Sequence, residues 1–134
     1  MAYNAASAGD ELVLKDGIYT GSGDDVLKIA KHITIRALNT RMAILDGEDV
    51  RRVISIWCCT VVLEGLAITK GSRRGSAADV QAGTADADGA GLYIDYGNVI
   101  LKSCAIHDNR VDGNGGGLYI TGGDVNLSDC EIYH

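Results

Sequence analysis

A repeated segment in the second half of the chain constrains the fold more than any other feature of the sequence. Residues 89–108 are GAGLYIDYGNVILKSCAIHD and residues 115–134 are GGGLYITGGDVNLSDCEIYH, so the copies start 26 residues apart and share 10 of 20 positions. A fixed period of this length is typical of a stacked architecture, in which each repeat packs mainly on its neighbours. The chain is therefore expected to be a solenoid.

Earlier copies align with these two once the spacing at the turns is allowed to vary. The aligned apolar positions form columns, and the columns come in pairs two residues apart, which places both side chains on one face of a strand. The pairs are Leu12, Ile33, Val61, Val99, Val125 with Leu14, Ile35, Leu63, Leu101, Leu127; then Leu27, Ile54, Leu92, Leu118 with Ile29, Ile56, Ile94, Ile120; then Leu66, Cys104, Cys130 with Ile68, Ile106, Ile132. Three pairs per repeat predict three short strands per coil.

The predicted fold is all-β: a right-handed parallel β-helix of about five coils, because crossovers between parallel strands are almost always right-handed. A narrow interior of Val, Ile, Leu and Cys explains why the chain has no Phe, and tight corners explain its 18 Gly. We expect one domain over residues 1–134, with a short cap at 1–10, an inserted loop at 71–88 and an uncapped last coil. A β-sandwich with coincidental repeats is the alternative.

Composition excludes several classes of partner. The net charge of −6 repels phosphate backbones and anionic lipid headgroups, so nucleic acid is not an expected partner. The longest nearly unbroken apolar run, residues 53–63, is shorter than the roughly 20 residues that cross a bilayer, and no secretory signal is visible. The four Cys lack CxxC spacing, so they predict neither a zinc nor a redox motif. The compartment remains open.

Any catalytic carboxylates are expected in the outward-facing columns. Glycoside cleavage needs an acid and a base within about 5 to 10 Å of each other. The columns are Val13, Thr34, Val62, Ile100, Asn126; Lys15, Arg36, Glu64, Lys102, Ser128; and Ala30, Trp57, Asp95, Thr121. None contains acids on adjacent coils, so no catalytic, cofactor or metal site is expected, and the chain is predicted not to be an enzyme.

Longer stretches also resemble a known family. The segments GDELVLKDGIYTGSGDDVLKI, HITIRALNTRMAILDGEDVRRVISI, VVLEGLAITKG and NGGGLYITGGDVNLSDCEIYH look like the β-helix repeats of pectin-lyase-like and polymorphic-outer-membrane-protein-like chains, notably predicted proteins of unicellular algae. The resemblance covers nearly the whole chain and implies the β-helix fold. Surface proteins and polysaccharide-acting enzymes share such repeats, so it leaves the function open.

Two groups of residues are candidate binding sites. The first is the inserted loop with its charged residues Arg73, Arg74, Asp79, Asp86 and Asp88, for which a mobile loop is the alternative; Asp86 and Asp88 alone give far fewer oxygens than calcium takes. The second is the outward aromatic set Tyr93, Tyr119 and Trp57, a candidate sugar platform or protein-contact surface. An ordinary cross-strand aromatic pair is the alternative there.

Other reactive side chains are expected to be structural. Cys104 and Cys130 share an inward column and are predicted to be core thiols, because stacked side chains that point the same way suit a disulfide poorly. Cys58 and Cys59 lie in a turn and are expected to face opposite ways. His107, in line with Thr69 and Tyr133, is predicted to be a surface imidazole.

The preferred functional prediction is a non-catalytic structural or interaction module. A parallel solenoid exposes unpaired backbone at its ends, and such edges recruit other chains. The outward residues Val13, Val62 and Ile100 form an apolar stripe where polar side chains would be expected. Other protein subunits, bound end to end or laterally, are the expected partners. The alternatives are a carbohydrate-binding or vestigial pectin-lyase-like protein and a fragment of a cell-surface adhesin.

Overall fold

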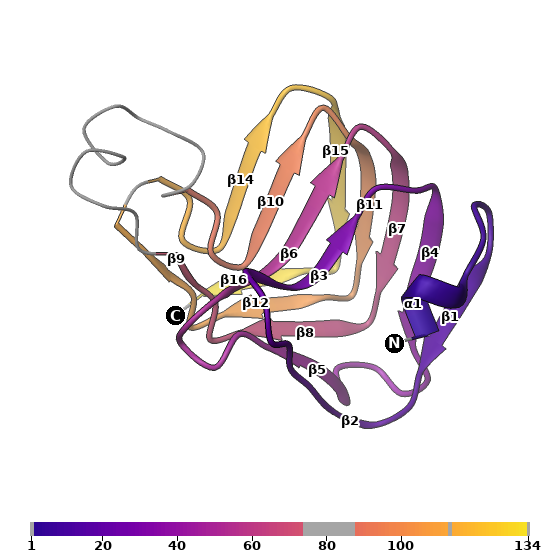
Figure 1. The fold of residues 1–134 in the computed structure, drawn as a ribbon, viewed down its shortest axis with the longest axis horizontal. Coiled ribbons are helices and arrows are strands. Elements are labelled where there is room, and N and C mark those ends of the chain that lie inside the picture. The colour runs from indigo at the N-terminus through magenta and orange to yellow at the C-terminus, as the bar shows by residue number, and fades with distance from the viewer. Residues whose placement is uncertain (1, 74–87, 113, 134) are drawn as a thin grey trace.

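The predicted fold class is confirmed. A computed structural model describes residues 2–73, 88–112 and 114–133. Short parallel strands wind into a β-helix with three sheets, and the described helix is α1 (Ala2–Ala5) (Figure 1). The axis runs from α1 and β1, at the right of the picture, to β14 at the left.

Each sheet contains one strand from each successive coil. The first sheet has the order β1 (Glu11–Leu14), β4 (Ile33–Ala37), β7 (Thr60–Glu64), β11 (Asn98–Lys102), β15 (Asp124–Ser128). The second sheet has the order β2 (Gly17–Tyr19), β5 (Ala43–Asp46), β8 (Leu66–Thr69), β12 (Ala105–His107), β16 (Glu131–Tyr133). The third sheet has the order β3 (Asp25–Ile29), β6 (Arg52–Trp57), β10 (Leu92–Asp95), β14 (Leu118–Thr121). A two-stranded sheet, β9 (Ser72–Arg73) with β13 (Arg110–Val111), widens the corner between the second and third sheets.

The chain thus makes four complete coils and adds two strands of a fifth. Each complete coil passes through the first, second and third sheets in turn, and the incomplete coil contains β15 and β16. The third sheet is consequently one strand shorter than the other two at the C-terminal end of the axis.

Identical residues stack in the interior, as the repeat predicts. Val99 pairs with Val125, Leu92 with Leu118, and Ile106 with Ile132. In the middle coils the inward side chains are fully buried, at 0% exposure for Ile56 and Ile94. Each large aliphatic side chain buried in this way contributes roughly 1.5 to 3 kcal/mol. The dry column of stacked side chains is therefore the main source of stability.

The predicted register of the first coil is wrong by two residues. Leu12 was aligned with Ile33, but it pairs with Ile35, and Leu14 pairs with Ala37. A shift of two residues leaves every side chain on its own face of the sheet. The alternation of apolar and polar residues therefore fits both registers equally well, and only the path of the chain between the strands decides between them.

The corners of the coils use glycine less uniformly than the composition suggests. At the corner between the first and second sheets, the left-handed position is Gly65 in one coil, with φ of 69°, but Ser103 and Asp129 in the next two, each with φ of 53°. Glycine is required for a different reason at Gly91, where a Cβ atom would lie 2.5 Å from the carbonyl oxygen of Gly117 on the next coil. Close approach of neighbouring coils, as well as turning, therefore accounts for part of the glycine content.

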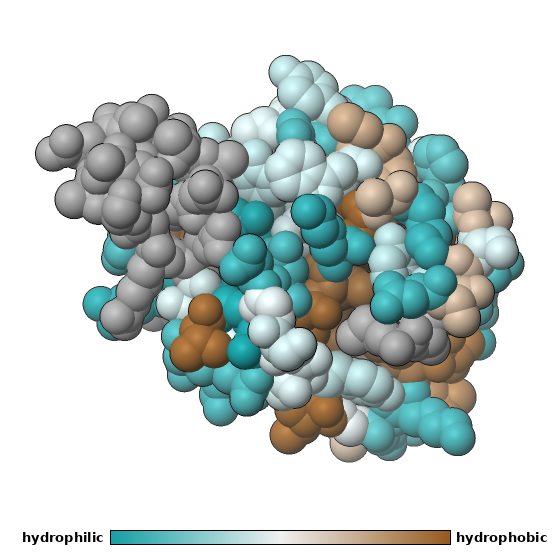
Figure 2. Space-filling model, viewed as in Figure 1, coloured by the Kyte–Doolittle hydropathy of each residue, from teal (hydrophilic) through white to brown (hydrophobic). Residues whose placement is uncertain are grey.

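The N-terminal end of the β-helix is covered by α1. Tyr3 is 9% exposed, and its hydroxyl accepts a hydrogen bond of 3.0 Å from the backbone N–H of Ala30, just after β3. Lys31 donates to the carbonyl oxygens of Tyr3 and Ala6 at 3.0 and 2.7 Å, and its ammonium lies over the Tyr3 ring. Figure 2 shows apolar surface beside the position of α1, so the cover is partial.

Candidate functional site

The predicted apolar stripe is interrupted. Val62 and Ile100 are neighbours on β7 and β11, but Val13 lies in line with Arg36, because the first coil is shifted by two residues. The position beside Val62 on β4 is Thr34. The continuous stripe Val13, Val62, Ile100 is therefore a wrong prediction of the sequence analysis. Two adjacent aliphatic side chains on a sheet face are ordinary for a soluble protein and do not define a docking surface.

The same shift changes the charged column of the first sheet. Val13, rather than Lys15, occupies its first position, and Arg36, Glu64 and Lys102 follow. Arg36 also donates from Nε to Glu11 Oε1 at 2.8 Å, with both side chains well exposed. Exposed ion pairs of this kind contribute about 0 to 1 kcal/mol each. This face therefore has a modest stabilising role and no obvious chemistry.

The aromatic set on the third sheet forms a ladder whose middle member is buried. The Tyr93 and Tyr119 rings are stacked, with centroids 5.5 Å apart and planes 15° apart, and the Trp57 ring lies 5.6 Å from Tyr93. The Arg52 guanidinium lies 4.6 Å from the Tyr93 ring centroid, and Tyr93 is only 4% exposed. Burial also raises the pKa of the Tyr93 hydroxyl. A flat platform for sugars needs free ring faces, and Tyr93 does not offer one.

The structure describes only the two ends of the candidate loop site, residues 71–73 and residue 88. Arg74, Asp79 and Asp86 lie outside the described residues, as does the side chain of Arg73, whose backbone belongs to β9. Asp88 is 2% exposed, and its carboxylate accepts a 2.6 Å hydrogen bond from the backbone N–H of Asn114 on the next coil. Arg52 donates to the carbonyl oxygens of Asp88 and Gly89 at 2.7 and 2.8 Å. The described contacts give Asp88 a structural role between coils.

A groove on the outer face of the second sheet was missed by the sequence analysis. It has a volume of about 370 Å³. Two outward columns form it: one has the apolar residues Ile18, Ile44, Ala67 and Ala105 and ends at Glu131, and the other is polar, with Asp46, Thr69, His107 and Tyr133. The alanines leave the hollow, because larger side chains in the same column stand on either side. The sequence does contain a signal for it, because the outward position of the second sheet is alanine in two successive repeats, at Ala67 and Ala105.

The polar side of this groove contains a His–Asp pair. His107 Nδ1 lies 2.7 Å from Asp108 Oδ2 and 3.4 Å from the Thr69 hydroxyl, and the His107 ring stacks on Tyr133 with a centroid distance of 5.1 Å. An ionised carboxylate only accepts hydrogen bonds, so His107 donates from Nδ1 to Asp108. That nitrogen then cannot take a proton from Thr69. The arrangement suits binding of polar groups better than activation of a nucleophile.

Arg41 closes one side of the groove and ties three coils together. Its Nε and Nη2 atoms donate to the carbonyl oxygens of Ser103 and Asp129, both at 3.3 Å, and its Nη1 lies 3.2 Å from Glu131 Oε1. These acceptors belong to the fourth coil and to the incomplete fifth coil. The Arg41 side chain thus supports the last two strands from the second coil.

The C-terminal end face consists of the outer edges of β14, β15 and β16 together with Ile120, Leu127 and Ile132. These inward side chains are 40%, 41% and 50% exposed, whereas their equivalents one coil earlier, Ile94, Leu101 and Ile106, are all 0% exposed. In the described part of the chain, no strand pairs with the outer edges of β14, β15 and β16. Apolar side chains and free backbone groups are therefore exposed together at this end.

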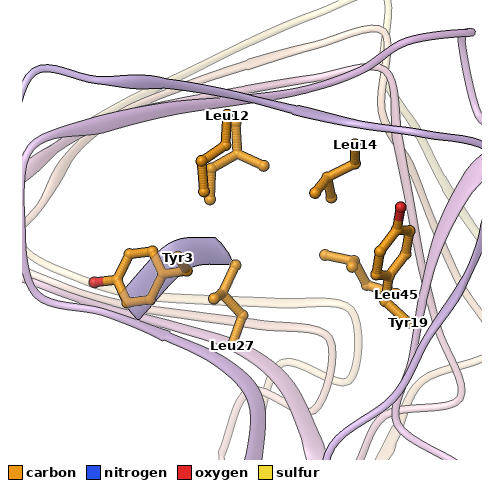
Figure 3. Close-up of a pocket in the computed structure, with 7 residues that line it drawn as sticks. Tyr3, Leu12, Leu14, Tyr19, Leu27 and Leu45 are labelled. Carbon is orange, nitrogen blue, oxygen red and sulfur yellow. The ribbon is translucent and has the colours of Figure 1, made fainter. Parts of the chain in front are cut away.

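The N-terminal end has a small apolar hollow beside α1. It has a volume of about 80 Å³ and is lined by the inward side chains of the first two coils and by Tyr3. In Figure 3, Tyr3 and its helix lie beside Leu27, while the space among Leu12, Leu14, Leu45 and Tyr19 is open. The cap therefore fills one side of this end and leaves the other side empty.

The cysteines are free thiols, as the sequence predicts for Cys104 and Cys130. Burial raises the pKa of Cys104 to about 11, and it also raises the pKa of Cys59. Cys58 is exposed while Cys59 is buried, so the adjacent pair faces opposite ways. Among residues 2–73, 88–112 and 114–133, no group of three or more His, Cys, Asp or Glu side chains could hold a metal ion.

Comparisons with known proteins add no family to this picture. The described residues include no helix with the length and apolar character needed to cross a membrane. No protein-family model matches the chain. The comparisons with curated proteins and with solved structures found no match either.

Proposed function

We propose that the chain is a structural and interaction module whose C-terminal end face docks onto the strand edges of another protein. The observation that carries the proposal is the contrast in exposure within single columns. Leu101 is 0% exposed and Leu127, its neighbour in the same column, is 41% exposed; Ile106 and Ile132 differ in the same way, at 0% and 50%. Side chains that form the core in one coil are at the surface in the next.

The backbone of the same strands is arranged for pairing. Ser103 N donates to Ser128 O at 2.9 Å, and Glu131 N donates to Cys104 O at 3.0 Å. Alternate residues of a parallel strand bond to opposite neighbours, so the backbone groups of Leu127 and Ile132 face the free edge. An unpaired edge of this kind is a template for another strand.

Apolar burial would supply much of the binding energy. Burial of a large aliphatic side chain is worth roughly 1.5 to 3 kcal/mol, and the end face has three of them partly exposed. Association costs several kcal/mol in lost freedom, so the backbone bonds and the side chains must act together. Lateral docking through the first sheet is not part of the proposal, because the apolar stripe there is interrupted.

A strand peptide tests this proposal directly. The probe is a fluorescent peptide of residues 98–107, which contains the strands that β15 and β16 already accept within the fold. We expect the peptide to bind the chain, and we expect Leu127→Asp to weaken binding at least about tenfold, because the substitution places a charge in the end face. Val50→Asp is the matched control, since Val50 is 68% exposed in a turn away from this face. Absence of binding to the unmodified chain would refute the proposal.

The second-sheet groove supports a second candidate, carbohydrate binding. Stacked rings of His107 and Tyr133 beside an apolar floor and the carboxylates of Asp46 and Asp108 are groups that recognise sugars. This candidate keeps the likeness to pectin-lyase-like repeats as a proposal and moves the site from the third sheet to the second. A glycan array should show binding that Tyr133→Ala abolishes and Tyr119→Ala preserves. Binding lost only in Tyr119→Ala would return the site to the third sheet.

A further inference from the structure

We infer that the partner of the C-terminal end face is the N-terminal end of a second copy of this chain, so that copies stack head to tail. The inference rests on the proposed function and names its partner. Three features of the two ends support it: the order of the edge strands, the shapes of the end faces, and the side chains that would meet.

The order of the edge strands is complementary. β1 and β15 are the opposite edges of the first sheet, and β2 and β16 are the opposite edges of the second sheet. All pairings within these sheets are parallel. A copy translated along the β-helix axis therefore presents β1 to β15 and β2 to β16 at the same time and in the parallel sense. A single translation satisfies both sheets, because each coil repeats the last one.

The steps in the two end faces also match. At the C-terminal end, the third sheet stops at β14 while the other sheets continue for one more strand. At the N-terminal end, α1 precedes β1 and lies against the edge of β3, where the Tyr3 hydroxyl accepts a hydrogen bond from Ala30 N–H. In a head-to-tail stack, α1 of one copy would occupy the missing position above β14 of the next. The helix that interrupts strand pairing at one end thus fits the gap at the other.

The side chains that would meet continue the interior columns. Leu127 ends the column that begins at Leu12, and Ile132 ends the column that begins at Tyr19. Leu12 and Tyr19 line the 80 Å³ hollow that α1 leaves open (Figure 3). Protruding aliphatic side chains at one end would therefore fill an apolar hollow at the other. Close packing of this kind recovers contacts that an empty hollow loses.

Charges along the first sheet would not oppose the joint. With Leu127 above Leu12, the outward residues Asn126 and Ser128 of β15 come to lie beside Glu11 and Val13 of β1. Neither uncharged residue repels its neighbour. Opposition comes from the corner after β15, where Asp129 falls beside Asp16 once Ile132 lies above Tyr19, and from the net charge of −6 on each copy; salt screens both. Association is therefore expected to strengthen as ionic strength rises, the reverse of a contact held by ion pairs.

The test uses two variants, each blocked at one end. Leu127→Asp blocks the C-terminal end. Ile18→Pro blocks the N-terminal end, because Gly17 N donates to Met42 O and the N–H of Ile18 consequently faces the free edge of β2, which a proline cannot pair. Val50→Asp again serves as the control. If Ile18→Pro lacks the native circular dichroism spectrum, Val13→Pro on the free edge of β1 takes its place.

Sedimentation velocity then distinguishes head-to-tail stacking from pairing of like ends. We expect the mean mass of the unmodified chain and of Val50→Asp to grow past the dimer with concentration, and each blocked variant to associate at least about tenfold more weakly. An equimolar mixture of the two blocked variants should form a dimer and stop there, because each has one usable end of the opposite kind.

Three results would overturn the inference. A monomeric unmodified chain that still binds the strand peptide would refute the second copy as partner and leave the proposed function standing. A monomeric chain that binds no peptide would refute both. A blocked variant that still dimerises alone would show that like ends pair with each other, which excludes the head-to-tail arrangement.

Discussion

The two ends of this β-helix consist of the same kind of coil but differ in what covers them. At the N-terminal end, Tyr3 of α1 is 9% exposed and is bonded to Ala30 and Lys31. At the C-terminal end, Ile120, Leu127 and Ile132 are 40% to 50% exposed. The comparison shows that side chains inside a stacked column are fully buried, whereas those at its open end are buried only in part. These last side chains would be fully buried only if another surface covered them.

The largest expected effect compares one substitution at two levels of the same column. Ile106 is 0% exposed and pairs with Ile132, which is 50% exposed. We expect Ile106→Ala to lower the free energy of unfolding by about 3 kcal/mol and Ile132→Ala by less than about 1 kcal/mol, because only the first leaves a buried cavity. Urea denaturation at a concentration where the chain is monomeric measures both. Equal losses would mean that the last coil is as well packed as the fourth.

The cap is tested by Tyr3→Ala. Loss of the Tyr3 ring uncovers the first coil, and we expect it to lower the free energy of unfolding by about 2 kcal/mol, less than a fully interior aromatic residue. Tyr3→Phe keeps the ring but removes the acceptor for Ala30 N–H, so it should cost about 1 kcal/mol. Hydrogen exchange at the Ala30 amide should increase in both variants. If Tyr3→Ala leaves stability unchanged, α1 does not act as a cap.

The dry interior can be tested through pH. Burial raises the pKa of Cys104 from 9.0 to about 11, so the unfolded chain loses the thiol proton at a lower pH than the folded chain does. Stability is therefore complete below about pH 9 and falls between pH 9 and 11, by about 1.4 kcal/mol per pH unit at most. Denaturation midpoints across this range measure the slope, and Cys104→Ala should reduce it. An unchanged slope in that variant would assign the effect to other groups, such as Tyr93.

The smallest effect is expected at Arg41, which links the second coil to the exposed end. Its contacts with the Ser103 and Asp129 carbonyls and with Glu131 are partly exposed, so Arg41→Ala should cost about 1 kcal/mol. Amide exchange should accelerate in β15 and β16 and stay unchanged in β4. Arg36→Ala, which removes an exposed pair with Glu11, is the control and should not alter exchange in the last strands. Uniform acceleration throughout the chain would contradict the local role of Arg41.

The repeat predicted the interior well and the surface less well. Columns such as Val61, Val99 and Val125 follow from identity and alternation, and the structure pairs them as expected. The first coil was misaligned because a shift of two residues preserves the face of every side chain. That error created the apolar stripe through Val13. The error arose where the repeat was most diverged, and the lengths of the turns did not fix the register of the first strand independently.

The candidate sites depended on contacts between coils that the sequence does not specify. Tyr93 was correctly placed outward and stacked on Tyr119, but its burial involves Arg52 from the preceding coil. The groove on the second sheet requires Thr69, His107 and Tyr133 in register and small residues beside them. The repeat alone places these three residues in line, and the hollow beside them comes from Ala67 and Ala105 in the neighbouring column.

The sequence by itself determined the period, the three strands per coil and the identity of the stacked interior, because a strand face requires side chains two residues apart and a solenoid requires them to recur. Tertiary structure alone decided the register of the first coil, the burial of Tyr93, and the contrast between a covered and an exposed end. Those features depend on how far each corner carries the chain and on which distant side chains reach across it, and neither is encoded in the alternation of residues.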